Sequence, residues 1–223
     1  SLINDGSWNV LQDHKATTGA LTGSGTFLLQ TVDATATTLE LAQTGDSQFN
    51  GTFTGVGNWT KSGSGTLTVS SAQTFTGELS VNSGRVITTG TATLADDVSV
   101  MVGTNGHLSL NVADTTGTID SYGTLDLNDK MTVNSLDVVD GITYVNDDLT
   151  VQMDTESLNV EDPGQLVIAD DVRVALSGGL SGDGDIQLVD EAEIELGAGT
   201  ISTFSGTFAE TQAGSIDSTL TIT

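Results

Sequence analysis

The sequence predicts an all-β protein that folds as a right-handed parallel β-helix, a solenoid of roughly ten rungs. Strand-favouring threonine and valine are abundant, and 27 glycines and a single proline punctuate them. No window of about twelve residues has the 3.6-residue periodicity of an amphipathic helix. Short alternating strands recur instead at intervals of about 20 residues. These three observations together define the fold class.

Ten triplets in the sequence alternate apolar, polar and apolar residues. Because successive side chains of a strand point to opposite faces, each triplet predicts a short strand with one buried face. The triplets are Leu39–Leu41, Leu67–Val69, Leu79–Val81, Val98–Val100, Leu108–Leu110, Leu125–Leu127, Leu149–Val151, Leu158–Val160, Ile186–Leu188 and Ile194–Leu196.

The triplets belong to a longer repeat: a glycine, an alternating strand, an aspartate at the sixth position after the glycine, and a second short strand. A weaker copy begins at Gly106, where Val112 replaces the aspartate, and Thr93 breaks the alternation in the first full copy. Repeats of this length without helices predict stacked β-rungs, whereas a propeller blade needs about 40 residues. The five full copies begin at Gly90, Gly123, Gly141, Gly164 and Gly184.

A second recurring signal is a pair of glycines separated by one residue. We expect these pairs to form tight corners with positive φ, and the phenylalanines that follow them to fill the core at or beside a corner. The glycine pairs lie in Leu21–Phe27, Lys61–Leu67 and Leu180–Ile186, and the downstream Phe-x-Gly motifs are Phe49–Gly51, Phe75–Gly77 and Phe204–Gly206.

Residues 57–86, GNWTKSGSGTLTVSSAQTFTGELSVNSGRV, closely resemble the passenger-associated β-strand repeat of autotransporters. The matching features are Lys-x-Gly-x-Gly-Thr-Leu-Thr at 61–68, Phe75–Gly77 and the end Val81–Gly84. Weaker matches to the same repeat occur near 21–53 and 180–208. The resemblance implies a passenger carried to the extracellular side of a Gram-negative outer membrane by a β-barrel that is not in this sequence.

We expect residues 1–223 to be a single β-helix domain and a fragment of a longer passenger, with the passenger-associated repeat at 57–86 within it. No signal peptide opens the sequence, and it ends inside a strand-like run at Ser218–Thr223. Many β-helical passengers are adhesins, and several self-associate to aggregate cells, so the resemblance also implies a role in surface contact.

Composition excludes several classes of function. The formal net charge is −25, from 30 acids and 5 bases, which argues against binding to nucleic acid and to anionic lipid. The absence of cysteine excludes disulfides, thiolate metal sites and cysteine nucleophiles. No apolar run approaches the roughly 20 residues of a membrane-spanning helix, so we expect no membrane insertion of this segment.

The sequence lacks a convincing set of catalytic residues, and we expect that the protein is not an enzyme. Gly45-Asp-Ser47 resembles the start of a serine-protease signature, but Gln48 replaces the next glycine, and neither His14 nor His107 lies in a motif. A glycan-cleaving β-helix needs clustered carboxylates or a base beside them, and the five bases share no repeat position. Such an enzyme remains a second alternative.

The sixth repeat position forms a column of aspartates. If the rungs stack in register, these carboxylates lie about 5 Å apart and repel by roughly 1 kcal/mol per pair even in water. The simpler explanation is an Asx turn, in which each carboxylate accepts a nearby backbone N–H at a solvated corner. The alternative is a Ca²⁺ ladder, and otherwise we expect no cofactor. The column consists of Asp96, Asp129, Asp147, Asp170 and Asp190.

Charge is uneven, because residues 126–195 contain 18 of the 30 acids and only two bases, Lys130 and Arg173. The simpler interpretation is a solvated outer face, and the functional one is an acidic stripe that tunes contact with partners. The family resemblance and the missing catalytic groups favour a cell-surface adhesin that acts in aggregation, attachment or biofilm formation. Its partners would be other copies of itself or ligands on host or abiotic surfaces, glycans and matrix proteins among them. The first alternative is a stalk or transport and folding segment whose functional domain lies elsewhere.

Overall fold

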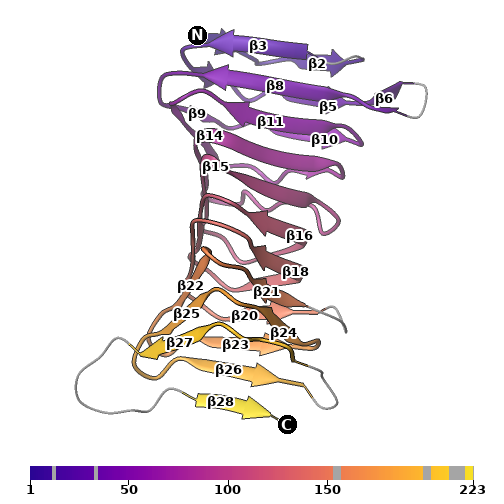
Figure 1. The fold of residues 1–223 in the computed structure, drawn as a ribbon. Helices are drawn as coiled ribbons and strands as arrows, with labels where there is room; N and C mark the ends of the chain where they lie inside the picture. Colours follow the sequence, from indigo (N-terminus) through magenta and orange to yellow (C-terminus); the bar gives the residue numbers. More distant parts are fainter. Residues whose placement is uncertain (12–13, 33–34, 153–156, 198–201, 211–218, 223) are drawn as a thin grey trace.

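The computed structural model describes residues 1–11, 14–32, 35–152, 157–197, 202–210 and 219–222. These residues form a β-solenoid of about nine turns, and no helix occurs in the described ranges. Figure 1 shows the turns stacked along one axis from the N-terminus to the C-terminus. The all-β, parallel solenoid is therefore confirmed, with about nine turns where the repeat length predicted roughly ten.

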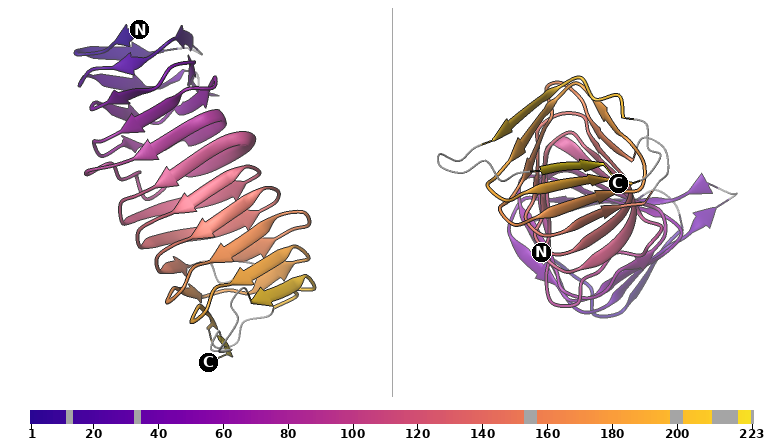
Figure 2. Two further views of the ribbon diagram at one scale, coloured as in Figure 1. Left: turned by 90° about the vertical axis from the view of Figure 1, so that its left-hand side faces the viewer. Right: turned by 90° about the horizontal axis from the view of Figure 1, so that it is seen from below.

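Each regular turn passes through three faces that surround the core, as the view along the stack shows (Figure 2, right). The first face begins with the paired strands β1 and β4, and β4 contacts β9. Its strands are β1 (Leu2–Ile3), β4 (Leu21–Thr22), β9 (Ser47–Phe49), β12 (Thr66–Val69), the C-terminal parts of β14 (Glu78–Thr88) and β15 (Ser99–Leu110), β17 (Thr124–Leu127), β19 (Ile142–Val145), β22 (Gln165–Ile168), β25 (Asp185–Leu188) and β27 (Thr207–Glu210).

The second face is made of β2 (Ser7–Val10), β5 (Thr26–Leu29), β10 (Thr52–Gly55), β13 (Thr74–Phe75), the N-terminal parts of β16 (Asp114–Ser121) and β18 (Met131–Val138), β20 (Leu149–Val151), β23 (Arg173–Leu176), β26 (Glu193–Leu196) and β28 (Thr219–Ile222). The third face is made of β3 (His14–Thr18), β8 (Thr38–Gln43), β11 (Asn58–Ser62), the N-terminal parts of β14 and β15, the C-terminal parts of β16 and β18, β21 (Leu158–Val160) and β24 (Leu180–Gly182).

The strands of neighbouring turns pair in parallel and keep their repeat register. Leu127 of β17 lies beside Val145 of β19, which in turn lies beside Ile168 of β22. Because alternate side chains point inward, apolar residues form continuous columns inside the solenoid. The apolar residues of all ten predicted triplets are buried, which confirms the alternation found in the sequence.

The core changes in character along the stack. In the N-terminal turns, aromatic rings pack on one another: Phe53 stacks on Phe27 at 5.1 Å and on Trp59 at 4.1 Å between ring centroids. Phe49 and Phe75 are fully buried, whereas Phe204 is only half-buried. The prediction that the Phe-x-Gly phenylalanines fill the core is therefore confirmed for two of the three. Farther along, the core is mostly aliphatic.

The glycine pairs at 63/65 and 182/184 form the corner between the third and first faces, which we call the glycine-pair corner, whereas Gly23 and Gly25 lie between β4 of the first face and β5 of the second. The first glycine of each pair has a positive φ: 112° at Gly23, 81° at Gly63 and 99° at Gly182. At Gly63 an added Cβ would lie 2.3 Å from the carbonyl oxygen of Gln43 in the preceding turn. The corner therefore requires glycine both for its backbone conformation and for the close approach of two turns.

The second face is interrupted at residues 89–98, which we call the seam. No strand forms on this face between β13 and β16, so the prediction of a strand directly after Gly90 is wrong. Side chains replace part of the missing ladder. At the seam the Oδ2 of Asp114 accepts the Leu94 N–H at 2.6 Å, and one turn earlier, where β13 has only two residues, the Oε1 of Gln73 accepts the Phe53 N–H at 2.8 Å. The irregular alternation at Thr93 was the sequence signal for this break.

A short antiparallel arm leaves the second turn. It consists of β6 (Thr31–Val32) and β7 (Thr35–Ala36), and it is the one antiparallel pair among the described strands. The arm projects from the stack in both Figure 1 and Figure 2. Its base is closed by the Thr37 N–H, which donates to the Gln30 carbonyl at 3.0 Å. The repeat pattern did not predict this insertion.

Candidate functional site

The predicted aspartate column lies at one corner of the solenoid, between the first and second faces. Asp129, Asp147, Asp170 and Asp190 each follow a strand of the first face and precede one of the second, so the structure stacks them as the repeat predicted. We call this corner, with the acids at 148, 171 and 191 that follow three of them, the acid corner. The prediction that Asp96 belongs to this column is wrong, because Asp96 lies inside the seam, eight residues after the first-face strand of its turn ends at Thr88, whereas the other four follow such a strand by two residues.

The carboxylates of the acid corner accept backbone hydrogen bonds. Asp129 Oδ1 accepts the Lys130 N–H at 2.8 Å, and Asp147 Oδ1 accepts the Asp148 N–H at 2.7 Å. Asp170 reaches the next turn and accepts the Glu191 N–H at 3.3 Å. The predicted bonding of these three carboxylates to nearby backbone amides is confirmed, although Asp170 reaches the following turn rather than its own.

Two cations offset part of the repulsion at this corner. The Lys130 ammonium lies 3.0 Å from Asp148 Oδ2, and this bond lowers the pKa of Asp148 and raises that of Lys130. Arg173 pairs with Glu193 at 4.0 Å and more closely with Glu195. The remaining acids still repel: a hydrogen bond with Asp171 and then its charge, together with Asp190 and Asp170, raise the pKa of Glu191.

The acid corner does not gather its carboxylates around a common point. Within the described ranges, no group of three or more His, Cys, Asp or Glu side chains is placed to hold a metal ion. A Ca²⁺ site needs six to eight oxygen ligands at about 2.3–2.6 Å. The alternative of a Ca²⁺ ladder at Asp96, Asp129, Asp147, Asp170 and Asp190 is therefore left to the calcium titration described in the Discussion.

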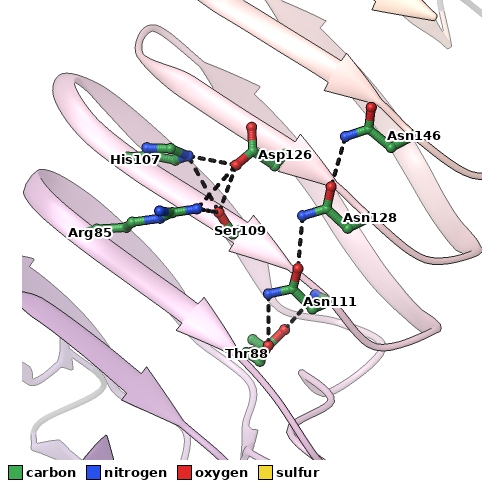
Figure 3. A network of polar contacts seen from close by, with 8 residues as sticks. All are labelled: Arg85, Thr88, His107, Ser109, Asn111, Asp126, Asn128 and Asn146. Carbon is green, nitrogen blue, oxygen red and sulfur yellow. Dashed lines mark hydrogen bonds and ion pairs between the residues drawn. The ribbon is translucent and has the colours of Figure 1, made fainter. Parts of the chain in front are cut away.

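A ladder of asparagines stands directly before the acid corner (Figure 3). Asn146 donates its side-chain amide to Asn128 at 2.7 Å, and Asn128 donates to Asn111 at 2.8 Å. Asn111 in turn donates to the carbonyl oxygen of Thr88 at 3.0 Å. The three asparagines are exposed, so the ladder forms a regular polar edge that crosses four consecutive turns.

A second polar cluster lies on the outer surface of the first face (Figure 3). The Oδ2 of Asp126 lies 2.7 Å from His107 Nε2, and it accepts hydrogen bonds from the Ser109 hydroxyl at 2.8 Å and from Arg85 Nη2 at 3.4 Å. Arg85 Nη2 also donates to the Ser109 hydroxyl at 2.7 Å. The four side chains come from three successive turns and tie them together across the sheet.

This cluster contains Ser, His and Asp, but it does not have the order of contacts of a hydrolytic triad. In a triad one ring nitrogen of the histidine faces the serine and the other faces the aspartate. Here His107 Nε2 faces both Asp126, at 2.7 Å, and Ser109, at 3.3 Å. Ser109 is also fully buried, so its hydroxyl is not open to a substrate.

The spacing of lysine and arginine did not predict this cluster, because the five residues of these two types share no repeat position. Alignment on the glycines contains the signal. Arg85 and His107 each follow a glycine directly and lie side by side, whereas Ser109 and Asp126 each stand three residues after a glycine and also lie side by side. His14 lies in β3, and its side chain is outside the described part of the chain.

Lys61, within the segment 57–86, points into the solenoid and is fully buried. Its ammonium donates to the carbonyl oxygens of Ser62 at 3.1 Å, Gly63 at 2.9 Å and Ser83 at 3.3 Å. Burial lowers the pKa of Lys61 to about 8, and the charge of Asp46 opposes this shift. One turn earlier, buried Gln43 donates to the Gly45 carbonyl at 2.6 Å. Inward donors thus satisfy the carbonyls of the glycine-pair corner.

No family model, curated protein or solved structure matches this chain. No helix in the described residues is long and apolar enough to cross a membrane. The acid corner, the asparagine ladder and the Arg85–Asp126 cluster therefore define the candidate site by their geometry alone. The acid corner and the asparagine ladder expose polar groups that recur in successive turns, which suits contact with an extended partner better than enclosure of a small molecule.

Proposed function

We propose that this chain is a segment of a bacterial cell-surface adhesin, the passenger of an autotransporter, and that it acts by lateral contact along its solenoid faces. The asparagine ladder carries the proposal. Asn111, Asn128 and Asn146 present the same exposed amide in three consecutive turns. A partner that lies along the stack meets these identical weak sites at once, and their sum gives binding that no single site provides.

The acid corner determines how such contacts respond to salt. With a net charge of −25, two copies of the chain repel each other at long range. Salt screens this repulsion, with a Debye length of about 8 Å at physiological ionic strength. We therefore expect copy-to-copy contact to strengthen as salt rises, whereas contact with a cationic surface weakens.

The test is display of the chain on a non-adherent bacterial cell, with clumping and attachment measured across a salt series. One variant neutralises the acid corner by Asp129→Asn, Asp147→Asn and Asp170→Asn. Its matched control removes the same charge at the glycine-pair corner by Asp46→Asn, Asp140→Asn and Asp183→Asn, three acids that also accept backbone N–H groups. We expect the first variant to clump at lower salt than the control.

Two results contradict the adhesin proposal. Displayed cells that neither clump nor attach at any salt concentration remove its basis. Equal salt responses of the two triple variants would show that the acid corner does not govern the contact. Purified chain that stays monomeric at high concentration would separately exclude self-association, while leaving attachment to another surface open to the display assay.

The second candidate is a stalk or transport segment, favoured by residues 57–86, whose Trp59 and Lys61 are directed into the core. Whole turns can be removed in register. Trp59 pairs with Leu79, so deletion of residues 58–77 removes one turn, and Thr124 pairs with Ile142, so deletion of 124–141 is the matched control. Loss of surface export with the first deletion only indicates transport. Full export with reduced adhesion supports the contact role.

A further inference from the structure

We propose that Asp114 is a proton-controlled latch, whose carboxyl group holds the seam, residues 89–98, against the following turn and tightens as the solution becomes mildly acidic. The proposal concerns the fold itself and does not depend on adhesion.

The seam is held differently on its two sides. On the side of the preceding turn, the Thr93 carbonyl accepts the Gln73 N–H at 2.7 Å, a backbone bond. On the side of the following turn, the Leu94 N–H donates instead to a side chain, the Oδ2 of Asp114 at the start of β16, at 2.6 Å. Backbone pairing resumes only at Val98, whose carbonyl accepts the Gly117 N–H at 3.0 Å. A single side chain thus holds the centre of the seam.

Asp114 lies where a negative charge is costly. It is half-buried and lines a shallow hollow of about 460 Å³, together with Asp96 from the seam and Lys130 from the next turn. The Lys130 ammonium is bonded to Asp148 at 3.0 Å. Burial, and to a smaller extent the charge of Asp96, raise the pKa of Asp114 to about 6 against the opposing hydrogen bonds from Leu94 and Thr115.

The direction of the effect follows from proton linkage. In the closed seam the pKa of Asp114 is about 6, and once the seam opens into water it returns toward 3.8. Between these values the closed state binds more protons, so acidification favours closing by up to about tenfold for each pH unit. A neutral carboxyl group keeps a carbonyl oxygen that accepts the Leu94 N–H, so the latch holds without its charge.

Hydrogen exchange of the Leu94 amide in the full chain measures the latch directly. After correction for intrinsic exchange, we expect its protection factor to be about tenfold higher at pH 5 than at pH 7. The Leu125 amide, in the regular strand β17, serves as the internal reference for global opening. Equal protection of Leu94 at both pH values, relative to Leu125, would overturn the proposal.

Three variants test whether the pH dependence of Leu94 protection comes from Asp114. Asp114→Asn has no charge to lose, so Leu94 should have the same protection at both pH values. Asp96→Asn removes the neighbouring charge and should reduce the pH ratio, which keeps the proposal testable if Asp114→Asn fails to fold. Asp120→Asn is the matched control: burial and then the charge of Glu78 also raise the pKa of this aspartate of β16, but it lies on the third face. A wild-type ratio in Asp114→Asn, or a lost ratio in Asp120→Asn, contradicts the latch.

Discussion

The Lys61 ammonium donates a hydrogen bond of 2.9 Å to the carbonyl oxygen of Gly63 inside the closed core of the solenoid. Burial lowers the pKa of Lys61 to about 8, whereas the unfolded chain keeps the ordinary value of 10.5. Between these values the unfolded chain binds one more proton, so the free energy of unfolding rises with pH, by at most about 1.4 kcal/mol per pH unit.

The variant Lys61→Met removes this contribution. We expect its free energy of unfolding, measured in urea, to rise less between about pH 8 and pH 10 than that of the wild type. Lys130→Met, which removes an exposed lysine of the acid corner, is the control and should keep the wild-type slope in this range. An unchanged slope in Lys61→Met would show that Lys61 keeps its ordinary pKa in the fold.

The glycine-pair corner should not tolerate a side chain. Gly63→Ala introduces a Cβ at a φ of 81° and 2.3 Å from the Gln43 carbonyl oxygen, so we expect the variant to lose several kcal/mol or fail to fold. Gly6→Ala is the matched control, because nothing lies within 4 Å of its added Cβ. Thermal unfolding of the two variants measures the difference, and equal melting temperatures would contradict the account.

The Arg85–Asp126 cluster should contribute to the stability of the turns it connects. Asp126→Ala removes the acceptor shared by Arg85, His107 and Ser109, and we expect a loss of about 1–3 kcal/mol in urea unfolding. Asp129→Ala, three residues along the same turn, removes one local bond and should cost about 1 kcal/mol or less. A larger loss of unfolding free energy in Asp129→Ala than in Asp126→Ala would show that the shared acceptor does not stabilise these turns.

Calcium should not stabilise the fold. The Oδ1 atoms of Asp129 and Asp147 are bonded to backbone amides, and no metal-holding group of acids occurs in the described part of the chain. We expect no heat in calorimetric titration with Ca²⁺ and a melting temperature that a chelator leaves unchanged. Saturable heat that disappears in the Asp129→Asn, Asp147→Asn, Asp170→Asn variant would instead establish the aspartate column as a Ca²⁺ site.

Sequence periodicity predicted the regular turns because inward columns impose the same constraint at every rung. The glycine starts at 123, 141, 164 and 184 directly precede β17, β19, β22 and β25, and the aspartates lie at the corner they were expected to mark. Features that depend on contacts between unlike turns were not predicted. The seam, the β6–β7 arm and the inward-pointing Lys61 each depart from the repeat, and a pattern shared by all turns contains no information about them.

The Arg85–Asp126 cluster illustrates the same limit. Its members lie in three turns and have no common residue type, so only the register of β14, β15 and β17 brings them together. The pairing of β14 with β15 shifts between Val81 and Ser83, because β15 has one residue more in the matching stretch between Val102 and Asn105, and this changes the register locally. A one-residue shift reverses which side chains face outward, so small errors in alignment are enough to hide such a cluster.

The seam also separates the tryptophans of the chain from its tyrosines, so the two kinds of fluorescence come from different parts of the solenoid. Both tryptophans, Trp8 and Trp59, precede it, and both tyrosines, Tyr122 and Tyr144, follow it. Because each turn of a solenoid contacts only its neighbours, an irregular turn is a natural boundary between cooperative units. Tryptophan emission therefore reports on the aromatic N-terminal turns and tyrosine emission on the acidic C-terminal turns, so the unfolding of each part can be followed in the native chain without an attached label.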